Sequence, residues 1–260
     1  MVILEWKEFL EKRLPAGDGF SAVTVGVFDG VHLGHKALIE RIVKQRALPV
    51  IVTFRQNHKT YSSLYPGDIS SFRQKIKIFE SLGVGVTIAV DLNDTFRQMG
   101  GQEFFRLLRE YGKMGFLAVG SNFRCGHNRD TDASAIQQLN AREGIRVDIV
   151  ETLTEEAEPI SSSRIRKSIL QGRLREAEAM LGRPFSLDME GADFKAHGNL
   201  ICHVSALGRV LPPPGCYSVL LHYKDGSSGK AEIQIERGLI RIPVSRELEN
   251  IEFKSWSISV

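Results

Sequence analysis

The chain has 260 residues, 42% of them hydrophobic and 25% charged, and its 34 basic and 31 acidic side chains leave a formal net charge of +3. This is the composition of a globular protein, and it excludes collagen-like, low-complexity and wholly disordered chains. So small a charge does not indicate a nucleic-acid-binding protein. No apolar run approaches the ~18–20 residues that a membrane span needs.

The three cysteines, Cys125, Cys202 and Cys216, have no CxxC spacing, so they indicate neither a disulfide framework nor a zinc site. Charged residues in the opening MVILEWKEFL leave no apolar stretch of the kind that a secretion signal carries. We therefore expect a cytoplasmic protein, and the length indicates one or two domains.

The first part of the chain alternates β-type runs with helical patterns. Apolar, β-branched runs predict strands, and apolar side chains at helical spacing predict helices. The expected strands are residues 21–28, 49–54, 84–90, 116–120 and 145–150, and the expected helices are residues 34–46, 70–82, 102–111 and 134–142. Nearly continuous apolar strands separated by helices are typical of βαβ units, in which helices cover both faces of a parallel sheet. The sequence therefore predicts an α/β domain.

The pattern changes after Pro159. Two helices are predicted, at residues 161–171 and 174–181, and helical periodicity then ends. Short β-type runs follow, with turn residues between them, at residues 200–204, 217–223, 231–236, 239–244 and 251–258. Such runs are typical of a small β-barrel or sandwich. We therefore expect two domains, residues 1–183 and 184–260.

The segment GVFDGVHLGH, residues 26–35, carries the strongest chemical signal. It joins a predicted strand to a predicted helix, and N–H groups at a helix N-terminus bind anions. Gly30 permits a tight turn, and Gly34 lets a phosphate approach the backbone. His32 and His35 could both donate to phosphoryl oxygens and stabilise the charge of phosphoryl transfer. A metal pair or two ordinary surface histidines are the alternatives, but the position after a strand and a tight turn favours phosphate.

The strand followed by this motif resembles the nucleotidylyltransferase superfamily, and the FDGVHLGH form resembles bacterial FAD synthetases, which are two-module riboflavin kinase/FMN adenylyltransferases. Three further segments are similar to motifs of that family, in the family's order: VGSNFRCGHNRDTD at residues 119–132, ISSSRIR at 160–166 and QGRLREAEAMLGRPF at 171–185. The resemblance implies a Rossmann-like nucleotidylyltransferase domain with a parallel sheet, followed by a small β-barrel-like domain.

The resemblance also implies an activity, the transfer of AMP from ATP to FMN to give FAD and pyrophosphate. Because the attacking FMN phosphate is already an anion, such a reaction needs no general base, and catalysis rests on positioning and on neutralising the triphosphate. Mg²⁺ is expected to enter with ATP, since it prefers phosphate oxygens and water to a cage of protein ligands. No protein metal ligand, nucleic acid or membrane is expected as a partner.

The family's motifs assign roles to residues of this chain. His32, His35 and Arg166 are the expected catalytic residues, the histidines at the ATP phosphates and the guanidinium at the leaving β,γ-phosphates. The expected ATP-binding residues are Gly26, Phe28, Asp29, Gly34, Asn122, Ser162 and Ser163. The expected FMN-binding residues are Asn57, His58, Phe123 and Arg129. For ISSSRIR the alternative is an ordinary helix N-cap followed by a basic, solvated face.

Three departures from the family pattern fall where the flavin side of the pocket is expected. The family's F-x-P-H-P reads FRQNHK at residues 54–59, the second Phe of NFRFG is Cys125 and a later Gly is Thr131, and Pro159 replaces an arginine. These changes leave nucleotide transfer intact but could alter the affinity for FMN or the identity of the acceptor. We interpret Cys125 as an apolar filler rather than a reactive thiol.

The C-terminal part departs further. The family's kinase signature PTAN is missing from the sequence, although LPPPGCYSV at residues 211–219 resembles a family segment, and the stretch is shorter than the family's kinase barrel. Glu232 and Glu236 share one face of a predicted strand, most simply a solvated face. We therefore expect a reduced riboflavin-kinase-like domain without kinase activity.

Three alternatives stay open. The first is a nucleotidylyltransferase of the same superfamily with another phosphorylated acceptor, such as phosphopantetheine or a sugar phosphate. The second is a non-catalytic flavin- or nucleotide-binding regulator. The third is a fully bifunctional enzyme.

Overall fold

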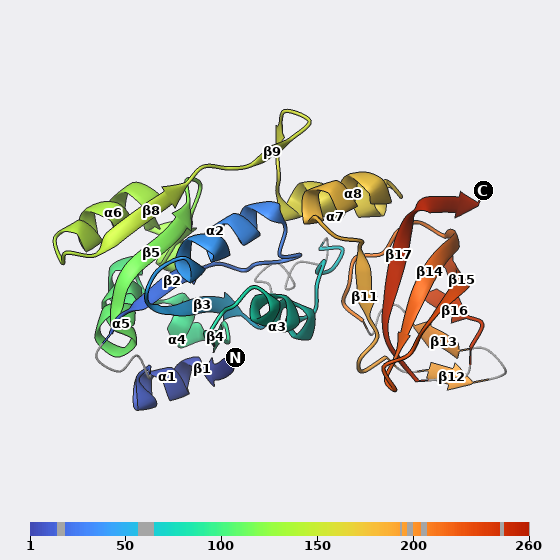
Figure 1. The fold of residues 1–260 in the computed structure, drawn as a ribbon, viewed down its shortest axis with the longest axis horizontal. Coiled ribbons are helices and arrows are strands. Elements are labelled where there is room, and N and C mark those ends of the chain that lie inside the picture. Colours follow the sequence, from blue (N-terminus) through green and yellow to red (C-terminus); the bar gives the residue numbers. More distant parts are fainter. Residues whose placement is uncertain are drawn as a thin grey trace. The chain divides into compact units, whose positions relative to one another are not determined.

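A computed structural model describes residues 1–14, 19–56, 65–192, 194–196, 200–203, 207–244 and 247–259. The chain divides into two compact units, whose elements are labelled in Figure 1. Unit 1 consists of Met1–Phe28, Gly34–Thr60 and Lys75–Thr154, and unit 2 of Asp29–Leu33, Tyr61–Gln74 and Glu155–Val260.

Unit 1 is built on a parallel sheet of six strands in the order β1-β4-β3-β2-β5-β8. The strands are β1 (Val2–Glu5), β2 (Ser21–Val25), β3 (Leu48–Phe54), β4 (Val86–Val90), β5 (Met114–Gly120) and β8 (Arg146–Val150). From β2 the sheet grows through β3 and β4 on one side and through β5 and β8 on the other. β2 therefore marks a topological switch point, and α/β sheets bind ligands at the carboxyl ends of the strands beside such a point.

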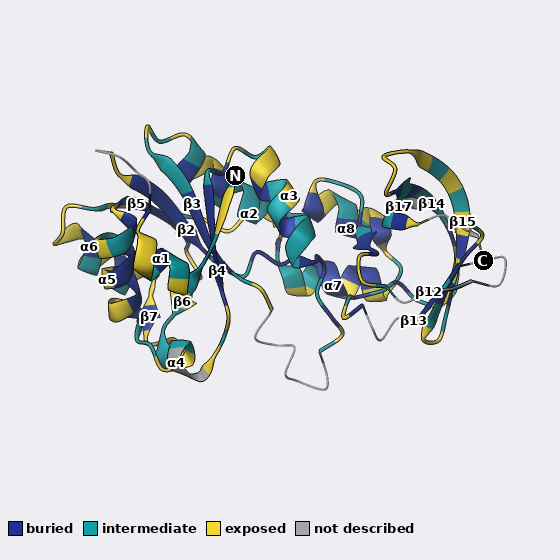
Figure 2. Cartoon of the chain, turned by 90° about the horizontal axis from the view of Figure 1, so that it is seen from below, coloured by how far each residue is buried: buried dark blue, intermediate teal, exposed yellow. Residues whose placement is uncertain are grey.

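The helices that follow these strands are α1 (Trp6–Lys12), α2 (Leu33–Val43), α3 (Phe72–Ser81), α4 (Asp94–Arg97), α5 (Gly101–Gly112) and α6 (Ala133–Ala141). The central strands are buried, as Figure 2 shows by their dark blue colour. The core of the unit consists of strand and helix side chains, among them Val23, Val50, Val52, Ile88, Leu117, Phe9, Phe105 and Ile136. The predicted parallel α/β domain is confirmed.

Short elements complete the connections. β6 (Arg124–Cys125) and β7 (Thr131–Asp132) form an antiparallel pair around the 3-10 turn η2 (His127–Arg129). β9 (Thr154–Glu155) pairs with β10 (Glu158–Pro159). The sequence patterns predicted none of these, nor β1, α1 and α4.

Unit 2 contains an antiparallel sheet of seven strands in the order β11-β17-β14-β15-β16-β13-β12. The strands are β11 (Ser186–Asp188), β12 (Phe194–Ala196), β13 (Leu200–His203), β14 (Gly215–Tyr223), β15 (Ser228–Glu236), β16 (Leu239–Ile242) and β17 (Leu248–Ser259). The sheet is curled but open, because β11 and β12 lie at its two ends with one neighbour each. The expected β-barrel-like domain is thus a half-barrel.

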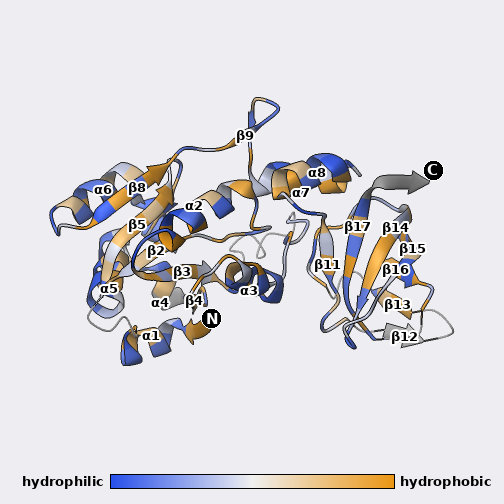
Figure 3. Cartoon of the chain, in the orientation of Figure 1, coloured by the Kyte–Doolittle hydropathy of each residue, from blue (hydrophilic) through white to orange (hydrophobic). Residues whose placement is uncertain are grey.

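Helices α7 (Ser162–Leu170) and α8 (Leu174–Leu181) share one core with this sheet. Side chains from both helices and from the strands form it, among them Ile165, Ile169, Ala177, Met180, Leu221, Ile233, Ile240, Ile251 and Phe253. The apolar colour of β14 in Figure 3 marks its contribution. The two compact units therefore divide the chain differently from residues 1–183 and 184–260, and that division stays a prediction about the family's modules.

Glu232 and Glu236 lie on strand β15, whose side chains alternate between buried and solvated. Ile233 and Ile235 are buried, whereas Glu232, which lies between Ala231 and Ile233, is exposed. Glu236 pairs with Arg241 at 2.9 Å. This alternation is that of a half-buried strand whose polar face is solvated. Elsewhere, none of the helices in the described part of the chain combines the length and the hydropathy of a membrane span.

Candidate active site

The chain leaves β2 through a turn with unusual backbone geometry, residues 28–31, here called the FDG turn. Phe28, Gly30 and Val31 have positive φ angles of 52°, 79° and 38°. Residues with a Cβ rarely adopt this region. A Cβ added to Gly30 would also lie 3.1 Å from the Ile69 side chain. Such a turn persists only when its surroundings hold it in place.

The Asp29 carboxylate is the centre of this support. It is 4% exposed, its Oδ1 accepts the backbone N–H groups of Ile69 at 2.9 Å and Ser70 at 3.2 Å, and its Oδ2 forms an ion pair with Arg166. Burial and the nearby Asp68 charge raise the pKa of this carboxyl, against the opposing effect of Arg166. The side chain expected at ATP is therefore engaged inside the protein, where it ties the turn to the segment that precedes α3.

Arg166 is likewise engaged inside the protein. Besides Asp29, its guanidinium donates to the Gly67 carbonyl and to the Tyr65 hydroxyl, both at 2.9 Å, and lies 4.9 Å from the centre of the Tyr65 ring. The Tyr65 hydroxyl donates in turn to Asp68 at 2.6 Å. The alternative of a basic, solvated face does not describe this residue, which is 6% exposed.

The serines of ISSSRIR have three different environments. Ser161 is the N-cap of α7 and accepts the N–H of Arg164 at 3.2 Å. Ser162 donates its hydroxyl to the Asp29 carbonyl at 2.8 Å, and Ser163 is exposed. The motif thus combines an ordinary cap with a hydroxyl that supports the FDG turn.

His32 follows the FDG turn and precedes α2, which begins at Leu33, one residue before the predicted helix of residues 34–46. Its side chain is 6% exposed. Burial and the charge of Arg183 lower the pKa of this imidazole to about 4, so it is neutral near pH 7. A neutral imidazole still has one N–H to donate.

Within unit 1, Gly26, Phe28 and His35 pack together. The His35 ring lies 5.1 Å from the Phe28 ring at 71°, and Phe28 also meets Phe79 edge to face at 5.6 Å. A Cβ on Gly26 would approach the Phe28 ring to 3.2 Å. Gly34 lies beside His35 in the first turn of α2. The structure thus brings three of the predicted residues into one packed group.

A cavity of about 640 Å³ opens at the carboxyl edge of the parallel sheet, in unit 1. Its walls come from the ends of β2 and β3, from the segment around α4 and from the loop after β5. They are formed by Val25, Gly26, Val27, Phe54, Leu92, Phe96, Arg97, Met99, Phe104, Asn122, Phe123, Arg124, Cys125, Gly126 and Arg129. Its size and largely apolar lining are those of a small-molecule pocket. It brings together the predicted residues Gly26, Asn122, Phe123 and Arg129, whereas Asn57 and His58 lie outside the described residues.

One wall of this pocket is tied in place by Asp130. Its carboxylate accepts the Gly101 N–H at the start of α5 at 3.1 Å and the Thr131 hydroxyl at 2.7 Å. A Cβ on Gly101 would lie 2.3 Å from that hydroxyl oxygen, so Thr131 and Gly101 fit each other. Burial, together with Asp130, raises the pKa of the Cys125 thiol to about 12, which agrees with an apolar filler.

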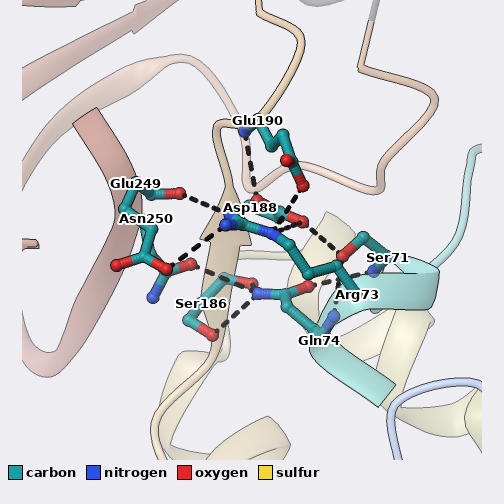
Figure 4. A network of polar contacts seen from close by, with 8 residues as sticks. All are labelled: Ser71, Arg73, Gln74, Ser186, Asp188, Glu190, Glu249 and Asn250. Carbon is teal, nitrogen blue, oxygen red and sulfur yellow. Dashed lines mark hydrogen bonds and ion pairs between the residues drawn. The ribbon is translucent and has the colours of Figure 1, made fainter. Parts of the chain in front are cut away.

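The sheet of unit 2 supports the FDG turn through the network drawn in Figure 4. Arg73 pairs with Asp188, with Glu190 at 2.7 Å and with Glu249 at 3.2 Å, and Ser71 donates to Asp188. Burial alone would raise the pKa of Asp188, but the hydrogen bonds from Arg73 and Ser71 lower it. The network fixes the segment whose backbone N–H groups hold Asp29.

Sequence reasoning missed several of these positioning groups. Lys75, 4% exposed, donates to the carbonyls of Phe54 at 2.7 Å and Val27 at 3.2 Å, at the ends of β3 and β2. Arg183 donates to the Gly30 and Val31 carbonyls of the FDG turn at 2.6 and 3.1 Å. The only signal in the sequence was that Arg183 lies within a family-like segment, LGRPF.

Comparisons with known proteins show which proteins this chain resembles. The family model for FAD synthetase matches residues 16–164. Bifunctional riboflavin kinase/FMN adenylyltransferases from Buchnera aphidicola and Escherichia coli K12 are both 29% identical, over 70% and 76% of this chain and 59% and 66% of their own lengths. The match thus spans less than two thirds of these relatives.

Among solved structures, a macrolide-efflux protein from Streptococcus pneumoniae superimposes with a TM-score of 0.80 over 97% of this chain and 89% of that chain. At 20% identity this similarity shows the fold alone. The match of the family model covers more than half of the residues, including the GVFDGVHLGH motif and the pocket. The chain belongs to the FAD synthetase family.

Proposed function

We propose that the protein is an FMN adenylyltransferase, which transfers AMP from ATP to FMN and releases pyrophosphate. The observation that carries the proposal is the pocket at the carboxyl edge of β2, because the strand that ends there continues directly into GVFDGVHLGH. The named relatives are bifunctional riboflavin kinase/FMN adenylyltransferases, which supports the same chemistry.

For the acceptor, we propose that the isoalloxazine ring of FMN enters this pocket. Phe54, Phe96 and Phe123 offer apolar and aromatic surface to a planar ring. Arg124 and Arg129, together with Arg97, supply positive charge for the FMN phosphate. Asn122 offers an amide at the same edge.

For the nucleotide, the N-terminus of α2 with Gly34 offers backbone N–H groups to the phosphates. His35 in the first turn and the neutral His32 before it each have a ring N–H that can stabilise the charge built up during transfer. Gly26 and Phe28 pack beside His35 and so border the path by which ATP would reach the N-terminus of α2. The residues therefore position ATP and neutralise its charge, and the attacking phosphate of FMN needs no base from the protein.

Arg166 could either contact the β,γ-phosphates of ATP or support the FDG turn, and the observed contacts favour support of the turn. Its donors are bound by Asp29, Gly67 and Tyr65, so it supports the FDG turn together with Ser162. To reach the β,γ-phosphates it would have to leave a buried carboxylate, at considerable electrostatic cost. Direct contact of Arg166 or exposed Ser163 with ATP stays a prediction.

Mg²⁺ is proposed to enter with ATP. Mg²⁺ prefers phosphate oxygens and water to a cage of protein ligands, so the phosphates of ATP would hold it. When bound, the ion would neutralise charge on the leaving pyrophosphate. The expected cytoplasmic location, and ATP and FMN as the partners, remain part of the same proposal.

The decisive experiment incubates the pure protein with ATP, Mg²⁺ and either FMN or riboflavin, and then separates the flavins. FAD from FMN supports the proposal, and adenylylation of another phosphorylated acceptor instead would favour the first alternative. Binding of FMN and ATP without any product would favour a regulator.

We also propose that riboflavin kinase activity is missing. No PTAN segment is present, and Glu232 and Glu236, the acids that could replace a catalytic base, lie on the solvated face of β15. Riboflavin with ATP is then expected to give no FMN. Formation of FMN that disappears in Glu232→Gln or Glu236→Gln would restore a bifunctional enzyme.

A further inference from the structure

Among the described side chains, Arg183 alone donates to two consecutive carbonyls of the FDG turn. Its Nη2 donates to the Gly30 carbonyl at 2.6 Å and its Nη1 to the Val31 carbonyl at 3.1 Å, with a longer contact to the Leu181 carbonyl at 3.4 Å. The two short bonds reach consecutive peptide groups from the two Nη atoms, a geometry that matches the planar fork of a guanidinium. They therefore fix the backbone that leads directly into His32.

The charge of Arg183 is also unusual. In the described part of the chain it has no carboxylate partner: only backbone carbonyls accept its hydrogen bonds. Burial lowers the pKa of this guanidinium to about 10. Arg183 is half-buried, and a charge partly removed from water without a counter-ion is costly, so it can indicate a functional role. Arg166, in contrast, is neutralised by Asp29.

The positive charge of Arg183 affects the titration of the His32 imidazole. After burial, Arg183 is the charged group that lowers the pKa of His32, and the result is about 4. A ring that stays neutral keeps the same donor pattern across physiological pH. Residues 29–31 of the turn, the imidazole and the guanidinium thus form one arrangement, all of it within unit 2.

We propose that Arg183 is a positioning residue for adenylyl transfer, which fixes the FDG turn and through it the place of His32, and whose positive charge is left for an anionic nucleotide phosphate. This inference rests on the proposed function. It adds a residue outside the histidine and ISSSRIR motifs, located after α8 at the start of the segment that leads to β11.

Two substitutions separate the geometry from the charge. Arg183→Lys keeps the charge but loses the fork, whereas Arg183→Gln loses the charge. Arg173→Gln at the start of α8 is the matched control, because Arg173 is half exposed and pairs with Glu176 at 2.6 Å. For each protein we would measure kcat, the KM values for ATP and FMN, and the titration of the His32 imidazole by NMR.

In Arg183→Gln we expect the His32 pKa to rise from about 4 toward 6.5 and kcat/KM for ATP to fall by ~10²-fold, with the KM for FMN unchanged. In Arg183→Lys we expect the imidazole titration to stay near that of the wild type and kcat to fall by ~10-fold, since an ammonium lacks the planar pair of donors that fits both carbonyls. The control should match the wild type in every measurement.

Wild-type kcat in both variants, or a His32 titration that Arg183→Gln does not move, would overturn the inference. If Arg183→Gln does not fold, Arg183→Lys decides by its kcat and its titration. If the wild type makes no FAD, the proposed function fails, whereas ATP binding and the His32 titration still test Arg183. Equal ATP binding by wild type and Arg183→Gln would then reject its role.

Discussion

The pocket at the sheet edge and the FDG turn are built in opposite ways. The pocket of unit 1 is hollow, and its wall is mostly apolar surface with arginines around it. The FDG turn of unit 2 is filled, and the polar groups of Asp29, Ser162 and Arg166 are bonded to one another or to the backbone. A substitution in the pocket should therefore change ligand affinity by a moderate amount. A substitution at the turn should instead lower stability, because it leaves a buried charge or a strained backbone without support.

The most severe test of this difference is Arg166→Ala. Because the pair is buried, its loss should lower the free energy of unfolding by about 3–5 kcal/mol and abolish activity. Urea denaturation measures the first effect and FAD formation the second. The double variant Asp29→Ala/Arg166→Ala should recover part of the stability, since no charge is left unpaired. An Arg166→Ala protein of wild-type stability would show that the turn is not built around this pair.

The second test follows the pH. The folded-state pKa of His32, about 4, lies below the ordinary value of 6.5, so the unfolded chain binds a proton first as the pH falls. The stability from the neutral ring is complete above pH 6.5 and is lost as the pH falls through about 4, with a maximum of about 3 kcal/mol.

Denaturation of the wild type and His32→Asn between pH 7 and 4 measures this contribution. The difference between the two proteins removes the effect of Asp29, whose raised pKa acts with the opposite sign. The same substitution at exposed His203 is the matched control. Parallel curves for the wild type and His32→Asn would contradict a buried, neutral His32.

A smaller effect is expected at His35. His35→Ala should lower kcat by ~10²-fold, because one donor to the transition state is lost in a shielded site. The melting temperature should change little, since the ring is half-buried and Phe28 keeps its contact with Phe79. Wild-type turnover in this variant would remove His35 from the mechanism.

The smallest effect is expected in the pocket. Phe123→Ala should raise the KM for FMN by ~10-fold, through the loss of aromatic contact, and leave the KM for ATP unchanged. Phe20→Ala is the matched control, because Phe20 is 41% exposed and does not line the pocket. If both KM values rise equally, the pocket does not discriminate between acceptor and nucleotide.

The regular elements of both units were predictable because their apolar periods are long enough to stand out. The helix at residues 174–181 has the predicted bounds, and β14 to β17 lie within a few residues of the predicted runs. β1 and the pair β6–β7 were not predictable, because four or two residues carry no readable period. A local sequence pattern does not predict contacts between distant segments. It therefore predicts neither the strand order nor the core that α7 and α8 share with the half-barrel.

The site was predictable in its residue types but not in its bonds. The histidines and the glycines follow from the motif, and the pocket brings Phe123 and Arg129 together, while their role in binding FMN stays a prediction. Three interactions could not be read from the sequence. Arg166 pairs with Asp29, Arg183 donates to two carbonyls, and Lys75 donates to the ends of two strands. A side chain's charge is visible in a sequence, but its partner is not.

The connectivity of the FDG turn has a consequence for biosynthesis. Ser162, Arg166 and Arg183 lie 133, 137 and 153 residues beyond the groups that they hold in the turn. A ribosome must therefore complete most of the chain before the turn can close, although β2 and α2 are made early. Contacts so distant in sequence are slow to form, because the entropy of closing a long loop must be overcome first. We expect the nascent chain to complete its sheet first and to acquire a nucleotide site only when α7, α8 and the segment after them have emerged.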